Sequence, residues 1–494
     1  MQSPIKLKNP SIFQSQAYSG EWIEAKSGET FDVEDPGTGK IFASCPDLGA
    51  EDVDTIVQSS HNAFQKYRNL NPRTRAQLLL KWHQLILENR DDLAILLTHE
   101  TGKPLSEAYG EIDYAVGFTW WFIGEAERIR GDISVPAAPN RRVMVIKQPI
   151  GVCAALVPWN FPIAMILRKV GAALAAGCTM IAKPSPETPL TTLALAYLAE
   201  KAGFAKGVFS VITTSNTKTP ELSEALCKHP LVHKVSFTGS TYVGSIIASH
   251  CAVGLKKVTL ELGGNCPFII FNDANQDQAL DQLNLLKWRH AGQACVTANR
   301  IYVQDGIYEE TLAEMVSHAK SIRLGHGSKS GVTMGPLTTS RGLEKATRQV
   351  EDAVQRGATV IHGGKPSATD GYFFEPTILR DMEESMSITH EESFAPIAAV
   401  YIFKTETEVV NLANNTEMGL ASYVFTKNVD RMWRMMEGLE AGMIGLNTGN
   451  SSAAESPFGG MKMSGYGKES GKDVAVAEYL VSKTCTLTLE TDSS

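Results

Sequence analysis

The sequence has little of what disulfide-bonded or metal-bound proteins are built on. Its eight cysteines form no CxxC pair and have no histidine cluster beside them, which disfavours a disulfide framework and a structural zinc site. They stand at positions 45, 153, 178, 227, 251, 266, 295 and 485. We therefore expect free thiols in a reducing compartment, and we predict no metal ligands.

The sequence also lacks an excess of basic residues, a signal peptide and a membrane span. With 46 Lys and Arg against 54 Asp and Glu, the net charge of -8 disfavours nucleic acid and anionic membranes as partners. Residues 1–20 have neither an apolar signal core nor an arginine-rich presequence, and the apolar run 170–182 is too short to cross a bilayer. These features predict a cytoplasmic protein that acts on small molecules.

Short apolar runs alternate with helical segments from Gly151 onward. We expect strands at 152–157, 179–182, 209–212, 234–237 and 257–260, and helices at 163–176, 190–202, 221–228 and 241–251. Continuous apolar strands separated by helices are typical of a parallel sheet covered on both faces. A second alternating region, from 267 to about 447, contains expected strands at 301–303 and 398–403 and a helix at 307–322. The fold class is therefore α/β, with two or three domains in 494 residues.

Two further regions lie outside this alternation. Apolar residues at helical spacing predict one helix over 75–97, stopped by Gly102-Lys103-Pro104, and a second over 107–130. Residues 479–489 are rich in β-branched side chains at period two, which predicts an exposed strand. An exposed strand edge needs a partner, so this segment and residues 143–146 are candidates for an oligomerisation sheet.

The ends of the predicted strands carry polar and glycine residues where parallel sheets bind ligands. These ends read PWNFP at 158–162, KPSP at 183–186, TGST at 238–241 and ELGG at 261–264. No GxGxxG motif opens a helix, but Gly239 precedes Ser240, which can cap the next helix and leave its N–H groups free for a phosphate. An ordinary capped turn is the alternative.

Cys295 lies in the segment WRHAGQACVTANR, residues 288–300, among small residues. A cysteine nucleophile needs thiolate character, room for a carbonyl group and N–H donors facing the oxyanion that forms. Gly292 and the neighbouring alanines provide the room. A buried cysteine that acts only as a small apolar residue is the alternative.

Seven motifs occur in a fixed order along the chain. They are PWNFP, KPSPETP, FTGSTYVG, LELGGN, GQAC, EESFAP and PFGGMKMSGYG. With them the chain resembles the NAD(P)-dependent aldehyde dehydrogenase superfamily over essentially its whole length, and it is most similar to succinate-semialdehyde dehydrogenases. The resemblance implies a Rossmann-type cofactor domain at 1–130 and 151–262, a catalytic domain at 263–445, and bridging strands at 131–150 and 475–494. It also implies a homodimer or homotetramer that serves γ-aminobutyrate catabolism.

The resemblance assigns three catalytic roles. Cys295 matches the nucleophile that forms a thiohemiacetal with the aldehyde, and Asn160 matches the side chain that binds its oxyanion together with the Cys295 N–H. Glu261 matches the general base for thioester hydrolysis. Its presence disfavours the branch of the family that transfers the acyl group to coenzyme A.

The resemblance also places the cofactor, expected to be NADP, NAD or both. It implies that the phosphates and the adenosine ribose lie near Trp159, Lys183, Gly239 and Ser240. It places the nicotinamide ribose near Glu392 and Phe394. Relatives that use only NAD carry an acidic residue three positions after the lysine, but here Ser185 is followed by Pro186. The missing carboxylate predicts that NADP is accepted, whereas Glu187 next to it leaves the use of NAD open.

Three residues match the binding site for the substrate's far carboxylate, namely Arg168, Arg289 and Ser452. Surface ion pairs are the alternative for either arginine. Thr297 stands where some relatives carry a second cysteine, so a disulfide switch with the nucleophile is not expected. Four other interpretations of the chain stay open. It could be a glutarate-semialdehyde dehydrogenase, a broader aldehyde dehydrogenase, a thiol esterase without cofactor, or a structural member of the superfamily without catalysis.

Overall fold

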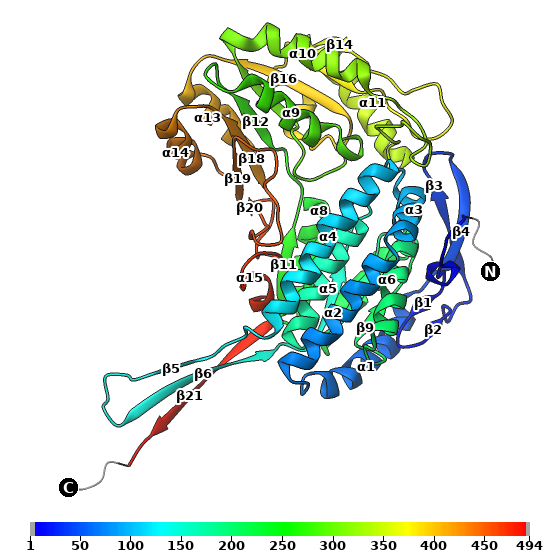
Figure 1. Ribbon diagram of the computed structural model, residues 1–494, viewed down its shortest axis with the longest axis vertical. Helices are drawn as coiled ribbons and strands as arrows, with labels where there is room; N and C mark the ends of the chain where they lie inside the picture. Colours follow the sequence, from blue (N-terminus) through cyan, green and yellow to red (C-terminus); the bar gives the residue numbers. More distant parts are fainter. Residues whose placement is uncertain (1–4, 491–494) are drawn as a thin grey trace.

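The computed structural model describes residues 5–490, so residues 1–4 of the expected first domain and 491–494 of the expected last segment lie outside the described residues. Two α/β bodies, each built on a seven-stranded sheet, lie end to end, and a long strand arm projects from one of them (Figure 1). The predicted α/β class is confirmed.

The first sheet contains the five strands that the apolar runs predict, and these five are parallel. Two short antiparallel strands from the amino-terminal segment extend its edge. In spatial order the strands are β11 (Lys257–Glu261), β10 (Val232–Thr238), β7 (Val152–Leu156), β8 (Thr179–Lys183), β9 (Phe209–Val211), β1 (Ala17–Tyr18) and β2 (Trp22–Ile23). Strands β7 and β8 are buried along their whole length, as strands covered by helices on both faces must be.

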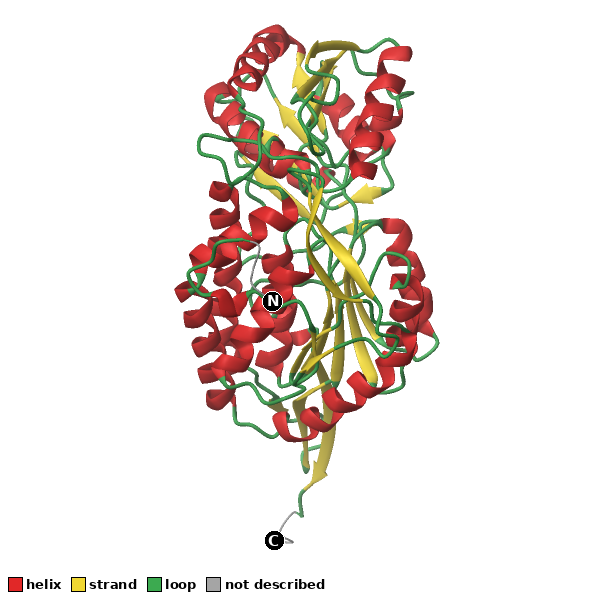
Figure 2. Cartoon of the chain, turned by 90° about the vertical axis from the view of Figure 1, so that its right-hand side faces the viewer, coloured by secondary structure: helices red, strands yellow, loops and turns green. Residues whose placement is uncertain are grey.

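Helices cover both faces of this sheet (Figure 2). On one face lie α2 (Pro72–Glu88), α3 (Arg90–Thr101), α4 (Leu105–Ala126), α5 (Pro162–Ala176) and α6 (Pro189–Ala202), and on the other α1 (Ala50–Tyr67), α7 (Thr219–Lys228) and α8 (Thr241–Ala252). The single helix predicted over 75–97 is wrong, because the chain leaves helical geometry at Asn89, whose φ is -103° and ψ is 18°. Apolar spacing continues across this break since α2 and α3 both pack on the same core.

The second sheet carries the other half of the chain and is parallel except for one edge strand. Its order is β14 (Thr359–His362), β15 (Thr377–Arg380), β16 (Ile397–Phe403), β13 (Arg300–Gln304), β12 (Pro267–Ile270), β18 (Ala421–Phe425) and β19 (Met443–Leu446). Its helices are α9 (Gln276–Lys287), α10 (Tyr308–Ser321), α11 (Ser340–Gln355), α12 (Ser387–His390), α13 (Glu406–Asn414) and α14 (Val429–Gly438).

The arm is a three-stranded antiparallel sheet of β5 (Asp132–Ser134), β6 (Arg141–Pro149) and β21 (Leu480–Thr488), which extends away from the body (Figure 1). It leaves large apolar side chains such as Ile133 and Ile146 exposed. The remaining short elements are β3 (Thr30–Asp35), β4 (Lys40–Pro46), β17 (Met418–Gly419), β20 (Met461–Lys462) and α15 (Val474–Ala477). Between residues 5 and 490, no helix has the length and apolar character needed to cross a bilayer.

Candidate active site

Cys295 follows a tightly turned segment at the junction of the two bodies. The three residues 290–292 all have positive φ, at 49°, 51° and 73°. A Cβ on Gly292 would lie 2.2 Å from the carbonyl oxygen of Ala395, so only glycine fits there. Thr297, two residues beyond the cysteine, is buried and donates a hydrogen bond to the Leu286 carbonyl at 3.1 Å. The turn therefore holds Cys295 at a fixed place relative to both sheets.

A cavity of about 380 Å³ lies against Cys295, which is half-buried and lines its wall. Residues of α4, α5 and α9 and of the loop after β19 form much of the wall, and residues of the neighbouring loops complete it. The polar residues that line it include Lys103, Glu107, Glu111, Arg168, Arg289 and Ser452. The cavity thus offers a thiol together with an unusual density of charged groups, which suits a small charged ligand.

The surroundings of Cys295 disfavour the thiolate form of its side chain. Burial raises its pKa well above the usual value, and the carboxylates of Glu392 and Glu261 add to this rise, while the guanidinium of Arg168 opposes it. The Cys295 N–H has no hydrogen-bond acceptor within residues 5–490, so it is free to donate to a ligand. Attack on a carbonyl by this sulfur therefore requires loss of the thiol proton as the ligand binds.

Asn160, at the start of α5, points its side chain toward the cysteine turn. Its Nδ2 donates to the carbonyl of Gln293 at 2.9 Å, and its Oδ1 accepts from the Phe161 N–H at 3.1 Å. An amide nitrogen carries two hydrogens, and the bond to Gln293 uses one. The second N–H has no acceptor within residues 5–490 and can donate to a ligand oxygen, although Asn160 is not among the residues that line the cavity.

Two residues that sequence reasoning missed hold Asn160 in place. The buried ammonium of Lys103 donates to the Asn160 carbonyl at 2.8 Å and forms an ion pair with Glu111. Glu111 also accepts from the Ile163 N–H at 2.9 Å, at the start of α5. In the sequence Lys103 serves only as part of a helix stop, and the signal that it matters is its burial, which spacing does not reveal.

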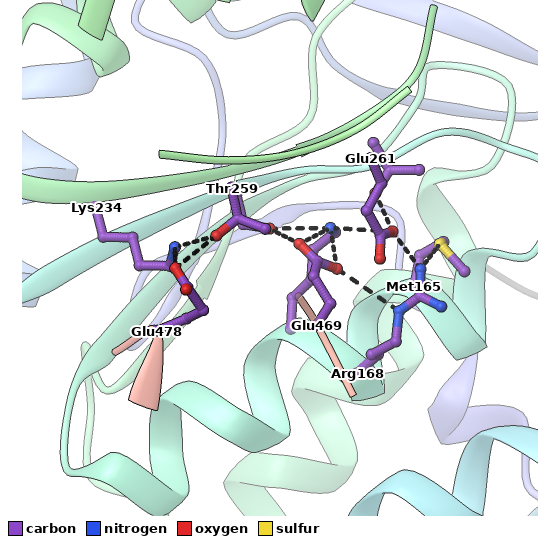
Figure 3. A network of polar contacts seen from close by, with 10 residues as sticks. Met165, Arg168, Lys234, Thr259, Glu261, Glu469 and Glu478 are labelled. Carbon is purple, nitrogen blue, oxygen red and sulfur yellow. Dashed lines mark hydrogen bonds and ion pairs between the residues drawn. The ribbon is translucent and has the colours of Figure 1, made fainter. Parts of the chain in front are cut away.

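Glu261, at the end of β11, lies behind the cavity wall rather than on it. Its Oε2 accepts from the guanidinium of Arg168 and from the hydroxyl of Thr238, the latter at 2.9 Å, and its buried Oε1 has no partner in residues 5–490 (Figure 3). Burial raises the pKa of Glu261, while the nearby cation of Arg168 lowers it. A buried carboxylate with an unused oxygen suits proton transfer.

Arg168 connects this carboxylate to the cavity, whereas Arg289 lies free. Arg168 is buried on α5, and its Nη1 has no hydrogen-bond partner in the described chain. Arg289 is exposed, holds its guanidinium 5.2 Å from the Phe161 ring centroid and forms no ion pair with residues 5–490. Ser452 reaches the same cavity and hydrogen-bonds to the hydroxyl of Tyr114. Both arginines thus present unused N–H donors near Cys295.

The carboxyl ends of β8 and β10 flank the end of β7, and the expected phosphate-binding residues stand there. Lys183 and Phe237 both pair with Leu156, so Gly239 and Ser240 follow on the other side of β7 from Lys183. Ser240 caps α8 by accepting from the Val243 N–H at 3.3 Å. The N–H groups of Thr241 and Tyr242, the first two of α8, and the Lys183 ammonium have no acceptor within residues 5–490, and this arrangement fits a phosphate-bearing dinucleotide.

The residues two and three positions after Lys183 are Ser185 and Pro186, and they affect the choice between NAD and NADP. Ser185 donates to the carboxylate of Glu187, which also accepts from Asn216 Nδ2 at 3.1 Å. Glu187 is thus held by two neighbours, while Pro186 offers no polar side chain. Burial lowers the pKa of Lys183 to about 8, and Glu187 opposes this shift.

The expected nicotinamide-side residues meet between the two bodies. Trp159 packs edge-on against Phe394 at 5.6 Å between ring centroids, and Phe394 has a positive φ of 55°. Glu392 accepts from the Gly264 N–H at 3.1 Å, in the loop that follows Glu261. Burial raises the pKa of Glu392 to about 7, whereas the Gly264 N–H opposes the rise. These residues come from both halves of the chain, and Gly264, which donates to Glu392, also lies against the backbone of Cys295.

Comparison with known proteins identifies the relatives of this chain. Residues 22–485 match the "Aldehyde dehydrogenase family". The chain is 48% identical to the 3-sulfolactaldehyde dehydrogenase of Pseudomonas putida, over 96% of this chain and 97% of that protein. It is 47% identical to the glutarate-semialdehyde dehydrogenase of Pseudomonas aeruginosa, over 96% and 98%. It is 46% identical to the NADP-type succinate-semialdehyde dehydrogenase 1 of Schizosaccharomyces pombe, over 98% and 97%.

A solved structure shares the whole fold. The crystal structure of succinate-semialdehyde dehydrogenase from Burkholderia pseudomallei superposes with a TM-score of 0.96 at 43% sequence identity, over 98% of this chain and 100% of that one. The likeness therefore extends over both sheets and the arm.

Proposed function

This chain belongs to the aldehyde dehydrogenase family, and we propose that within it the enzyme oxidises succinate semialdehyde to succinate with NADP or NAD. The enzyme is an NAD(P)-dependent aldehyde dehydrogenase. The observation that carries the substrate assignment is the pair of arginines, Arg168 and Arg289, that present unused N–H donors in the cavity of Cys295. Two guanidinium groups suit a carboxylate at the far end of a short aldehyde.

The names of the relatives support an anionic substrate. The three relatives described above are named for aldehydes that carry a carboxylate or a sulfonate at the other end. Glu107 also lines the cavity, but burial raises its pKa to about 7, which reduces its repulsion of an anion at neutral pH. Glutarate semialdehyde, which is one methylene longer, is the second candidate. The two arginines and the cavity volume of about 380 Å³ suit it as well.

In the proposed mechanism the Cys295 thiol loses its proton to solvent and the sulfur attacks the aldehyde carbon. The oxyanion then accepts from the Cys295 N–H and from the free N–H of Asn160. When bound, the nicotinamide cofactor held by the residues named below would provide the hydride acceptor for the oxidation of this carbon. The acyl group then remains on sulfur as a thioester. Glu261 takes a proton from the water that cleaves it, so the acid is released and the thiolate is restored.

We assign the cofactor to the edge formed by β7, β8 and β10. Lys183, Gly239 and Ser240 would hold its phosphate and ribose groups, and Trp159, Glu392 and Phe394 would lie beside the nicotinamide half. Ser185 and Pro186 leave no carboxylate at the position three after Lys183, which favours acceptance of a 2′-phosphate. Glu187 is bound to Ser185 and Asn216 and would have to leave them to accept from the ribose hydroxyls of NAD.

The Arg289→Leu variant should distinguish anionic from neutral aldehydes. Loss of a charge-assisted contact is expected to raise KM for succinate semialdehyde about 10 to 100-fold, because the substrate carboxylate loses one cation. KM for hexanal should change less than about threefold, since hexanal carries no charge. Initial rates at varied aldehyde concentration measure both values.

A surface arginine provides the control for this variant. Arg434 pairs with Glu406 on the outside of the second body, so Arg434→Leu is expected to leave both KM values unchanged. Equal increases for succinate semialdehyde and hexanal in the Arg289→Leu enzyme would contradict the carboxylate assignment.

The affinity for NADP should depend on pH through Lys183. Burial depresses its pKa to about 8, so the ammonium that would attract a 2′-phosphate is present below this pH and is lost as the pH rises through it. The dissociation constant for NADP is expected to rise by about tenfold per pH unit above 8, while that for NAD changes less than about threefold. Titrations followed by calorimetry between pH 7 and 9.5 measure both constants.

The Lys183→Met variant tests the origin of this dependence. It should bind NADP weakly at every pH with a nearly flat profile, because no titrating ammonium remains. A flat NADP profile in the unmodified enzyme would show that Lys183 does not bind the phosphate.

We further propose the domain and cellular assignments. The cofactor domain comprises 1–130 and 151–262, the catalytic domain 263–445, and the arm 131–150 and 475–494. The exposed apolar side chains of the arm support its use between subunits of a homodimer or homotetramer. Eight free cysteines support a reducing, cytoplasmic location. A role in γ-aminobutyrate catabolism follows from the proposed substrate.

A further inference from the structure

Arg168 stands between the substrate cavity and the carboxylate of Glu261. Its side chain lines the cavity, and its Cζ lies 4.2 Å from the ring centroid of Phe458 on the same wall. Its Nη2 donates to Glu261 Oε2, whereas its Nη1 has no hydrogen-bond partner in residues 5–490 (Figure 3). One guanidinium therefore contacts the proposed base and also carries an unpartnered Nη1, on a side chain that lines the cavity.

The charges around this contact are closely balanced. Lys169 Nζ lies 2.5 Å from Glu469 and donates to Ser236 at 2.9 Å, but it is 3.8 Å from Glu261. Arg168 Nε lies 3.6 Å from Glu469. Two cations thus face two carboxylates, and Arg168 is the cation in direct contact with Glu261. A third carboxylate entering from the cavity would compete with Glu261 and Glu469 for Arg168, with Arg289 as the other cation on the cavity wall.

We propose that the substrate carboxylate and Glu261 compete for Arg168, so that binding of an anionic acyl group releases Glu261 to act as the base. This inference rests on the proposed function, since it takes the far carboxylate as the cavity ligand. An anion on Nη1 draws the guanidinium toward the cavity and weakens its bond to Glu261. Glu261, with its Oε1 unpartnered, is then free to turn toward the thioester.

Release changes the strength of the base as well as its position. A carboxylate that loses contact with a guanidinium has a higher pKa, typically by about 1 to 3 units, and so accepts a proton more readily. In the hydrolysis, a bond forms between the water oxygen and the acyl carbon, the carbon–sulfur bond breaks, and the water proton goes to Glu261. The enzyme would thus select anionic substrates in the hydrolytic step and not only in binding.

Other side chains that face Glu261 also affect its pKa, so a test of the Arg168 contact must leave them unmutated. They are Lys169 on α5, Tyr114 on α4, Thr238 at the end of β10, Lys468 and Glu469 before α15, and Cys295. Comparison of two acyl groups on the same unmodified protein leaves all of these side chains in place. The matched pair is succinyl and butyryl, which differ by a carboxylate in place of a methyl group.

The decisive experiment measures thioester hydrolysis against pH without cofactor turnover. Mono(4-nitrophenyl) succinate and 4-nitrophenyl butyrate acylate Cys295 with release of nitrophenolate, and the steady phase after the burst reports hydrolysis. For each acyl group, the hydrolysis rate should rise with pH to a plateau. In the unmodified enzyme we expect the midpoint of this rise to lie about one pH unit or more higher for the succinyl group than for the butyryl group. Coincident profiles would overturn the proposal.

Two variants separate this inference from the substrate assignment. In Arg168→Met the midpoint pH for butyryl hydrolysis should rise to the value that the unmodified enzyme shows for the succinyl group, because the cation that holds Glu261 is gone. In Arg289→Leu the distance between the two profiles should persist, since Arg289 does not contact Glu261. An Arg168→Met butyryl profile unchanged from the parent would also overturn the competition. If neither variant raises KM for succinate semialdehyde, the proposed function fails instead.

Discussion

Replacing Cys295 with alanine is expected to lower kcat for aldehyde oxidation by at least about 10⁴-fold, because no other group on the cavity wall can form the thioester. Loss of the sulfur removes the covalent step, whereas the cofactor edge at β8 and β10 stays intact. Absorbance of reduced cofactor measures turnover and any burst. Binding of NADP to the variant, measured by titration, should match that of the parent enzyme.

A second cysteine provides the control for this variant. Cys485 is exposed on the arm, so Cys485→Ser is expected to keep the parent kcat. The buried Cys266 donates through Sγ to the Cys295 carbonyl at 3.4 Å and does not line the cavity, so it cannot reach a cavity ligand in place of the lost nucleophile. If Cys295→Ala oxidises aldehydes at a rate near that of the parent, the covalent mechanism is wrong.

Much of the first sheet was predictable because its strands and helices are distinct in the sequence. Residues 152–157 and 179–182 are apolar without interruption, as expected for strands with helices on both faces, and β7 and β8 lie there. The joining of β1 and β2 to this sheet was not predictable, since two-residue strands carry no periodicity. The break at Asn89 was also hidden, because the apolar spacing runs through it.

The active site likewise contains some residues that the sequence predicts and others that only the structure reveals. Cys295 and Asn160 stand in motifs that favour their positions, on a small-residue turn and at the start of a helix. Glu261 lies beside the ion pair of Lys169 and Glu469, which come from an apolar helix and from a loop near the other end of the chain. In the sequence Lys169 reads only as the boundary of an apolar run. A contact between residues 300 positions apart leaves no local pattern, so this network required the structure.

The Glu261→Gln variant is expected to separate acylation from hydrolysis. A glutamine cannot accept the water proton, so steady turnover should fall by about 10² to 10⁴-fold. Attack by Cys295 and the transfer to the cofactor do not need this base for hydrolysis, so a single burst of reduced cofactor should persist. Stopped-flow absorbance measures the burst and the later linear phase in one trace.

The matched control keeps the carboxyl group but removes a neighbour. Thr238 donates to Glu261 at 2.9 Å, and Thr238→Val is expected to retain turnover within about tenfold, because the base itself remains. Glutamine also lacks the negative charge that Glu261 offers to Arg168, so the variant should bind succinate semialdehyde no more weakly than the parent. A loss of the burst together with turnover would mean that Glu261 acts before the thioester forms, and unchanged turnover would mean that another group activates the water.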